Sequence, residues 1–188
     1  MATHDETPPP PGQVILLSGP VGAGKTAVAR ELVPRLPGRV AAIEGDRFWP
    51  FIARSDRSRR EDFHLVVRSM TAAAVPFARA GFTVLLDFST PPQTLPVVRR
   101  ILKELPLAYV ALVPALDVCA SRAAARAQGP IADYDERYAE FHALFDKVPD
   151  GHLAAEGTDA AATAELIAQD LVAGWYHVHD EPPPGARS

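Results

Sequence analysis

The sequence has a single cysteine, Cys119, so no disulfide can form within the chain, and a reducing compartment is expected. It contains no run of about 18 apolar residues, so no membrane-spanning helix is predicted. The first residues, MATHDETPPPPG, lack the basic and apolar segments of a secretory signal. Together these absences favour a cytoplasmic protein with no membrane partner.

Positive charge is not in excess either. The net charge of −4 gives no electrostatic reason to expect nucleic acid or an anionic membrane as the main partner. The six histidines show neither H-E-x-x-H nor Cys/His ligand spacing, so no zinc site is predicted. The 188 residues are 47% hydrophobic, which is typical of one globular domain with a substantial core.

Proline-rich polar segments lie at both ends, so we expect tails at residues 1–12 and 177–188 around one domain at residues 13–176. Within this domain, short apolar runs alternate with segments of helical periodicity. The predicted strands are residues 14–18, 39–44, 82–87, 107–113 and a short 152–155. The predicted helices are residues 25–36, 59–80, 92–104, 116–128, 134–147 and 159–175. This alternation predicts an α/β fold in which a five-stranded parallel sheet has helices on both faces.

A loop of small residues follows the first strand and matches G-x-x-x-x-G-K-[ST] without a gap. Such a loop lets backbone N–H groups turn toward an anion, and the next helix presents its N-terminus to the same anion. Lys25 can reach the β- and γ-phosphates of a nucleotide, and the Thr26 hydroxyl can ligate Mg²⁺. A chance glycine-rich turn is the alternative, although strand, loop and helix occur in the order that phosphate binding requires. The predicted phosphate-binding residues are Gly19, Pro20, Val21, Gly22, Ala23, Gly24, Lys25 and Thr26.

These eight residues resemble the Walker A motif of P-loop NTPases. The chain length and the order of elements resemble small P-loop kinases, which include shikimate, gluconate and adenylylsulfate kinases, chloramphenicol phosphotransferase and zeta-type toxins. The resemblance extends over most of residues 14–175, although only the loop is specific. It implies a three-layer P-loop NTPase fold with a short lid, ATP as the phosphoryl donor, Mg²⁺, and a small hydroxylated acceptor.

Asp46 follows the second strand in the segment IEGDRFW. Ligands bind outside the carboxyl ends of parallel strands, so Asp46 should lie near the phosphates if the first two strands are close in the sheet. An aspartate there can accept the proton of an acceptor hydroxyl. The segment also resembles the acidic element of gluconate and adenylylsulfate kinases and zeta-type toxins, but Glu44 stands where those have an aspartate. Alternatively, or in addition, Asp46 caps a helix that starts at Arg47.

Asp87 ends the third strand in VLLD, the form of a Walker B element, and such an acid holds Mg²⁺, usually through water. In the kinases that the chain resembles, the residue here varies and can line the acceptor site instead. A third option is a cap for the following turn. Ser89 and Thr90 are weaker candidates for hydrogen bonds to the acceptor.

Arg122 and Arg126 lie four residues apart in the predicted helix at 116–128, on one face. The resemblance implies that arginines here stack on the nucleotide base or neutralise the transferred phosphoryl group, with a small lid hinged at Gly129 and Pro130. The alternative is two exposed arginines on an alanine-rich helix. Arg137 ranks lower.

Gly157 and Thr158 follow the predicted fifth strand. In the small kinases that the chain resembles, the loop at this place often contacts the nucleotide base. A helix N-cap at Thr158 or Asp159 explains the same residues without a ligand. Near Asp46, the aromatic residues Phe48, Trp49 and Phe51 either form the wall of an acceptor pocket or pack their loop onto the core.

The leading hypothesis is therefore an ATP- and Mg²⁺-dependent phosphotransferase that acts on a hydroxyl of a sugar acid, an antibiotic or a nucleotide-like metabolite. Its rival is a nucleotide-binding switch with slow hydrolysis and a protein partner. A relative that binds nucleotide without turnover is a third possibility. Turnover that depends on an acceptor separates the kinase from the other two.

Overall fold

The computed structural model of the chain describes residues 10–54, 60–125 and 135–178. These residues form a four-stranded sheet in the order β2-β3-β1-β4, and all neighbouring strands are parallel. The strands are β1 (Val14–Ser18), β2 (Val40–Glu44), β3 (Thr83–Asp87) and β4 (Leu107–Ala111). β1, β3 and β4 are buried throughout, and their almost continuously apolar sequences suit strands that are covered on both faces.

The helices in the described part of the chain fall into two kinds. The α-helices are α1 (Lys25–Leu32), α2 (Arg60–Arg79), α3 (Leu95–Leu102), α4 (Leu116–Ala124), α5 (Glu136–Ala143) and α6 (Ala160–Val172). The 3₁₀-helices are η1 (Val33–Arg35), η2 (Gly45–Phe51), η3 (Pro92–Thr94), η4 (Leu144–Lys147) and η5 (Asp150–His152). None of these helices combines the length and the apolar composition needed to cross a bilayer.

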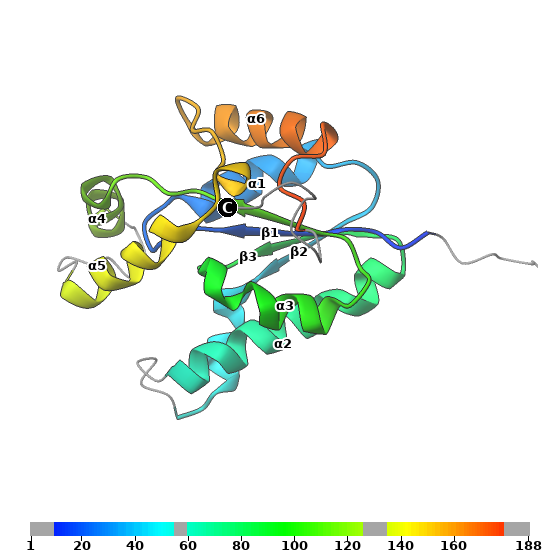
Figure 1. Cartoon of the computed structure of the whole chain (residues 1–188), viewed down its shortest axis with the longest axis horizontal. Coiled ribbons are helices and arrows are strands. Elements are labelled where there is room, and N and C mark those ends of the chain that lie inside the picture. The colour runs from blue at the N-terminus through cyan, green and yellow to red at the C-terminus, as the bar shows by residue number, and fades with distance from the viewer. Residues whose placement is uncertain (1–9, 55–59, 126–134, 179–188) are drawn as a thin grey trace, which may run out of the picture.

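These helices cover both faces of the sheet (Figure 1). α1 and α6 pack on one face, α2 and α3 pack on the other, and α4 and α5 lie at the edge toward which the strands point. Side chains alternate along a strand, so Leu16 of β1 packs in the cluster with α2, whereas Leu17 packs in the cluster with α1. The predicted arrangement of a parallel sheet between two helical layers is confirmed.

The strand register brings polar residues together at the carboxyl edge of the sheet. Leu17 of β1 and Glu44 of β2 both pair with Asp87, the last residue of β3. β3 therefore lies between β1 and β2, so the segment that carries Asp46 leaves the sheet two strands away from the glycine-rich loop. Segments that leave this edge still converge on one region, where open α/β sheets bind their ligands.

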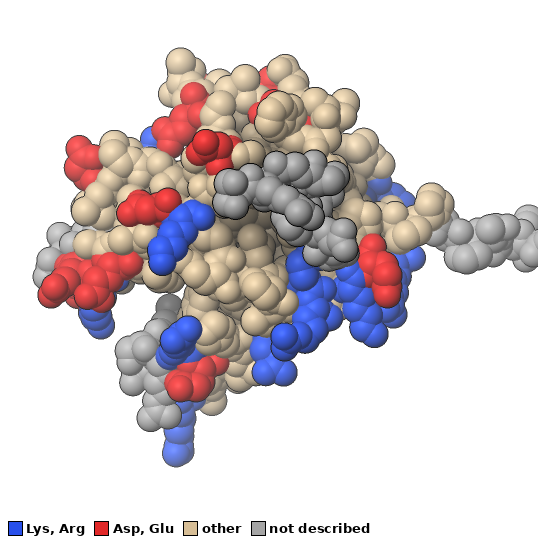
Figure 2. Space-filling view, viewed as in Figure 1, with Lys and Arg blue, Asp and Glu red and all other residues tan. Residues whose placement is uncertain are grey.

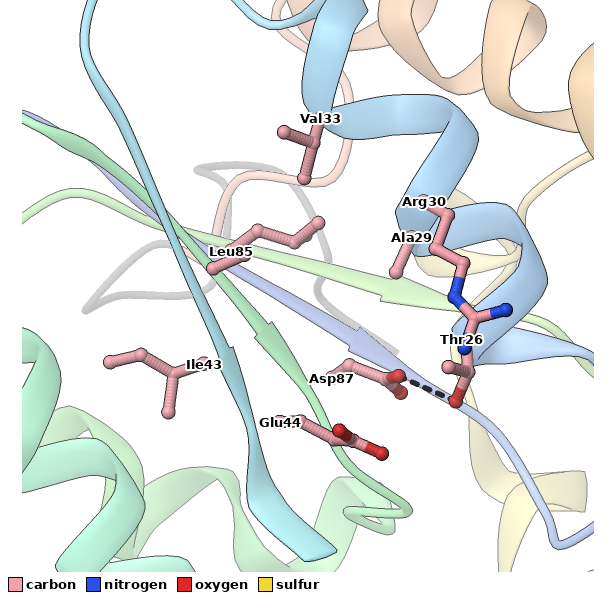
Figure 3. A pocket seen from close by; sticks show the side chains of 9 residues that line it. Thr26, Ala29, Arg30, Val33, Ile43, Glu44, Leu85 and Asp87 are labelled. Atoms are coloured by element: carbon pink, nitrogen blue, oxygen red, sulfur yellow. Dashed lines mark hydrogen bonds between the residues drawn. The ribbon is translucent and has the colours of Figure 1, made fainter. Parts of the chain in front are cut away.

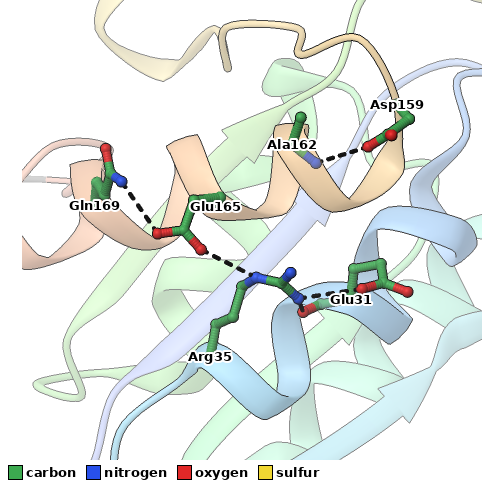
Figure 4. Close-up of polar contacts among 6 residues, drawn as sticks. All are labelled: Glu31, Arg35, Asp159, Ala162, Glu165 and Gln169. Carbon is green, nitrogen blue, oxygen red and sulfur yellow. Dashed lines mark hydrogen bonds and ion pairs between the residues drawn. The ribbon is translucent and has the colours of Figure 1, made fainter.

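A surface network of polar side chains joins α1 to α6 (Figure 4). Arg35, which follows α1, donates from Nε to Oε2 of Glu165 at 3.2 Å and from Nη1 to the carbonyl and carboxylate oxygens of Glu31. Gln169 donates to Oε1 of Glu165 at 3.1 Å. Such exposed pairs add little stability, so apolar contacts of buried residues such as Ile167 hold α6 in place.

The structure has a single bridge in place of the predicted fifth strand. Residues 150–152 form η5, and Leu153 makes one parallel bridge with Ala111 of β4. The free edge of β4 is already occupied in its first half by the C-terminal segment. There the carbonyl of Tyr176 accepts from the N–H of Tyr109 at 2.8 Å, and the N–H of Val178 donates to β4 at 2.8 Å.

Two boundaries in the structure differ from those expected: the C-terminal end of the domain and the end of the first helix. Residues 177 and 178 still pair with β4, so regular hydrogen bonding continues past the expected domain end at 176, and His177 is half-buried. The first helix, predicted to end at residue 36, ends at Leu32 and continues as η1, because Pro34 has no N–H to donate.

Candidate active site

The glycine-rich loop is shaped by close backbone contacts with the segments after β4. Gly19 and Gly22 have φ of 141° and 88°, which favour glycine. A Cβ on Gly22 would lie 2.1 Å from the carbonyl oxygen of Cys119 in α4, and one on Gly19 would lie 2.1 Å from that of Leu112. The motif glycines therefore let α4 and the residue that follows β4 pack directly on the loop.

Lys25 begins α1 and folds back across this loop. Its side chain is buried, and Nζ donates to the carbonyl oxygens of Gly19 at 3.1 Å and Pro20 at 2.9 Å. An ammonium group held over a loop of backbone groups at a helix N-terminus is placed to attract phosphate oxygens. The predicted phosphate-binding residues are thus together, and their role remains a prediction.

Thr26 and Asp87 meet at the carboxyl edge of the sheet. The Thr26 hydroxyl donates to Oδ2 of Asp87 at 2.8 Å (Figure 3). Burial raises the pKa of the Asp87 carboxyl. The charge of Lys25 and the hydrogen bond from Thr26 oppose that shift, and the negative charges of Asp46 and Glu44 add to it. The hydrogen bond thus joins α1 to β3, and charged groups of α1, β2 and η2 act on the pKa of Asp87.

A pocket of about 220 Å³ opens beside this pair, between α1 and strands β2 and β3 (Figure 3). Thr26, Asp87 and Glu44 lie at its polar end. The other lining residues are Ala29, Arg30, Val33, Ala42, Ile43 and Leu85. Since a water molecule takes about 30 Å³, the pocket has room for several. Mg²⁺ binds few protein groups and keeps several waters, so the hydroxyl, the carboxylate and the adjacent space fit that ion.

Asp46 lies inside η2, so the predicted helix cap at Asp46 is wrong. η2 begins at Gly45, so the N-cap position falls on Glu44, which makes no side-chain capping hydrogen bond. Asp46 is exposed, and its charge acts on the pKa of Asp87, which places it near the Thr26–Asp87 pair. Glu44 pairs with Nε of Arg47 at 3.0 Å.

Arg122 of α4 reaches the loop from the side. Its Nη1 donates to the carbonyl oxygen of Ala23 at 3.3 Å and lies 3.7 Å from the position of a Cβ on Gly24. Arg126 lies outside the described residues, as do the predicted hinge residues Gly129 and Pro130. Arg137 is exposed and pairs with Asp135 at 2.9 Å.

Gly157 and Thr158 precede α6, and packing accounts for the glycine. A Cβ on Gly157 would lie 2.6 Å from the Cβ of Ala162, and the N–H of Gly157 donates to Oγ1 of Thr163 at 3.0 Å. Asp159, not Thr158, caps α6 by accepting from the N–H of Ala162 at 2.8 Å (Figure 4). Contact of Gly157 or Thr158 with a nucleotide base remains a prediction.

The sequence did not reveal a buried hydrogen-bond network that joins the ends of the strands near the site. Oγ of Ser18, the last residue of β1, donates to the carbonyl oxygen of Thr90 and accepts from its N–H, both at 2.8 Å. The hydroxyl of Tyr109 donates to the same carbonyl at 2.9 Å. Thr90 is fully buried, so it ties the segment after Asp87 to β1 and β4 and is not exposed to an acceptor.

Asp87→Asn is expected to stabilise the protein without ligand and to remove its stabilisation by Mg²⁺ and nucleotide. A raised pKa means that the folded state binds the Asp87 proton more tightly than the unfolded state. The burial penalty on stability therefore appears as the pH rises from 3.8 through the native pKa of Asp87. Without ligand, the variant should melt a few degrees higher than the wild type at pH 7 and no higher in acid. Exposed Asp150→Asn is the control. An equal or lower melting temperature at pH 7 would contradict the burial penalty.

Comparisons with known proteins show the family and the fold. The family model AAA_33, an AAA domain, matches residues 14–146. Among solved structures, an APS kinase of Mycobacterium tuberculosis in complex with AMPPNP and APS is 18% identical with a TM-score of 0.66, covering 87% of this chain and 99% of that chain. A tunicamycin resistance protein of Deinococcus radiodurans is 20% identical with a TM-score of 0.66, and the match covers 85% of this chain and 95% of that chain.

The shikimate kinase of Acinetobacter baumannii in complex with shikimate is 20% identical with a TM-score of 0.59, covering 87% of this chain and 94% of that chain. No curated protein matches the sequence. Identities this low establish the fold, and the predicted likeness to small P-loop kinases is confirmed at that level. The chain belongs to the AAA_33 family of AAA domains and has the fold of the small P-loop kinases.

Proposed function

We propose that the protein is an ATP- and Mg²⁺-dependent phosphotransferase that moves the γ-phosphoryl group to a hydroxyl of a small molecule. The observation that carries this proposal is the 2.8 Å hydrogen bond between Thr26 and Asp87, next to Lys25 and the glycine-rich loop. A hydroxyl and a carboxylate at the helix N-terminus, beside a lysine at the loop, are the parts that hold Mg²⁺ and phosphates in P-loop NTPases.

In this proposal the loop amides and Lys25 bind the phosphates, and Thr26 and Asp87 hold the metal. Mg²⁺, when bound, neutralises charge on the phosphate oxygens. The exposed carboxylate of Asp46 orients the acceptor hydroxyl and takes its proton. Arg122, which already reaches the loop, stabilises the charge of the transferred group.

The remaining assignments are proposals that rest on the resemblance. Arg126 assists Arg122 from the same helix, and Gly157 and Thr158 contact the base. The acceptor belongs to the broad set of sugar acids, antibiotics and nucleotide-like metabolites. Support for a small acceptor comes from the compared structures, in which an APS kinase is in complex with APS and a shikimate kinase is in complex with shikimate.

Release of ADP, measured against a panel of hydroxylated metabolites and antibiotics, tests this function. We expect a low basal rate that at least one acceptor raises by several orders of magnitude, with the phosphorylated acceptor detected by mass spectrometry. A basal rate that every acceptor leaves unchanged, but that a protein partner alters, would contradict the proposal and favour a nucleotide-dependent switch.

A further inference from the structure

A row of aromatic rings leads from Asp87 to α5. Phe88 directly follows Asp87, and its ring stacks on that of Phe63 in α2 with centroids 5.7 Å apart. The ring of Phe63 contacts that of Phe141 in α5 at 6.2 Å, and Phe141 contacts Phe145 at 5.7 Å. We call these four residues the aromatic row.

All four rings pack in or against the core cluster, but only the ends of this row are fully buried by it. Phe88 and Phe145 are only 4% and 1% exposed, whereas Phe63 and Phe141 are half-buried. The two middle rings bridge α2 and α5, and the molecular surface is hollowed between these helices (Figure 2). Uncharged side chains cover the middle of this hollow, and charged ones stand on its margins (Figure 2).

A second aromatic pair lies on the helix that carries Asp46. Phe48 and Phe51 of η2 have ring centroids 6.0 Å apart, and Phe51 is 81% exposed. Packing onto the core does not account for a phenylalanine with most of its surface in water. Large apolar side chains exposed beside polar groups are common where proteins bind ligands.

Four arginines on the surrounding elements are already engaged with other groups. Each of these four has a hydrogen-bond partner within the protein, and an anionic acceptor would have to compete with that partner. The pairs are Arg47 with Glu44 at 3.0 Å, Arg60 with His64 at 3.3 Å, Arg122 with Ala23 at 3.3 Å and Arg137 with Asp135 at 2.9 Å.

We propose that the acceptor is a neutral alcohol with an aromatic or other apolar ring, which packs against Phe51 and the middle rings of the aromatic row. This inference rests on the phosphotransfer function proposed above. The acceptor oxygen bonds to the γ-phosphorus, the bond from that phosphorus to the β–γ bridging oxygen breaks, and ADP leaves. The hydroxyl proton passes to Asp46. An acceptor carboxylate among these rings would lose part of its hydration and would have to displace the present partners of these four arginines.

A matched pair of ligands tests the ring and the charge directly. The probes are 4-methylbenzyl alcohol and 4-(hydroxymethyl)benzoate, which share a ring and a hydroxymethyl group but differ in charge. The only other tryptophan is Trp175, so a Trp175→Phe variant leaves Trp49 of η2 as the reporter. Titrations that follow Trp49 fluorescence with Mg–ADP present should show roughly tenfold tighter binding of the neutral alcohol.

In the same background, Phe51→Ala should weaken binding of the neutral alcohol by roughly three- to tenfold. Phe77→Ala is the control, since Phe77 is also an exposed phenylalanine but lies at the far end of α2. Equal or tighter binding of the carboxylate, or an unchanged affinity in Phe51→Ala, would overturn the inference. If the neutral alcohol binds as expected but no alcohol is phosphorylated, the binding site for a neutral ring stands, whereas the phosphotransfer function and the role of the ligand as acceptor fail.

Discussion

Replacing Asp46 with asparagine is expected to lower kcat by roughly 10²- to 10⁴-fold, the usual contribution of a general base. The amide keeps the size of the side chain but cannot take a proton from the acceptor. Asp46 is exposed on η2, two strands away from the loop, so the Kd for Mg–ATP should stay close to the wild-type value. Rapid-quench measurement of acceptor phosphorylation and calorimetry of nucleotide binding give the two quantities separately.

Asp146→Asn is the matched control for this variant, because Asp146 is also an exposed aspartate in the first turn of a 3₁₀-helix. It should leave kcat unchanged. Asp46→Glu, which retains a carboxylate at a shifted position, should recover part of the activity. Turnover by Asp46→Asn within about tenfold of the wild type would fall short of a general base's contribution and remove Asp46 from the acid–base role.

Lys25→Met is expected to weaken Mg–ATP binding by roughly 100-fold and to abolish turnover, because it removes charge-assisted hydrogen bonds to phosphate. Methionine fills the space of the buried lysine stem, so the loop should keep its shape. Calorimetric titration measures the affinity, and far-UV circular dichroism reports whether the variant is folded.

Lys103→Met serves as the comparison for Lys25, since Lys103 is exposed and follows α3, at the start of the connection to β4. This variant should bind Mg–ATP like the wild type. Unchanged affinity in a folded Lys25→Met protein would mean that the glycine-rich loop does not bind the phosphates.

Local sequence patterns predicted the centre of this fold well. The apolar run before the loop, the spacing of its glycines and the helix after Lys25 predict β1, the loop and α1, and the structure has them in that order. Such signals involve neighbours in the chain, so one sequence carries them. Asp87 and Thr26 were both predicted near a metal, and the structure brings them within 2.8 Å of each other.

Features that depend on distant pairing were beyond such patterns. The predicted strand at residues 152–155 makes only one bridge with β4, and residues 176–178 pair with the first half of the same edge; no local signal shows either pairing. Ser18 and Thr90 lie 72 positions apart in the chain, so the sequence around each residue does not show that they form a hydrogen bond. The start of η2 at Gly45 was missed because Asp46 is itself a good cap residue.

Titration of the wild-type protein with ATP in a calorimeter, with and without Mg²⁺, tests most directly whether the loop at residues 19–26 binds a nucleoside triphosphate. We predict one site per chain that saturates in the presence of Mg²⁺ and becomes much weaker when the metal is chelated. No heat with ATP, GTP or any other triphosphate in the presence of Mg²⁺ would contradict the account.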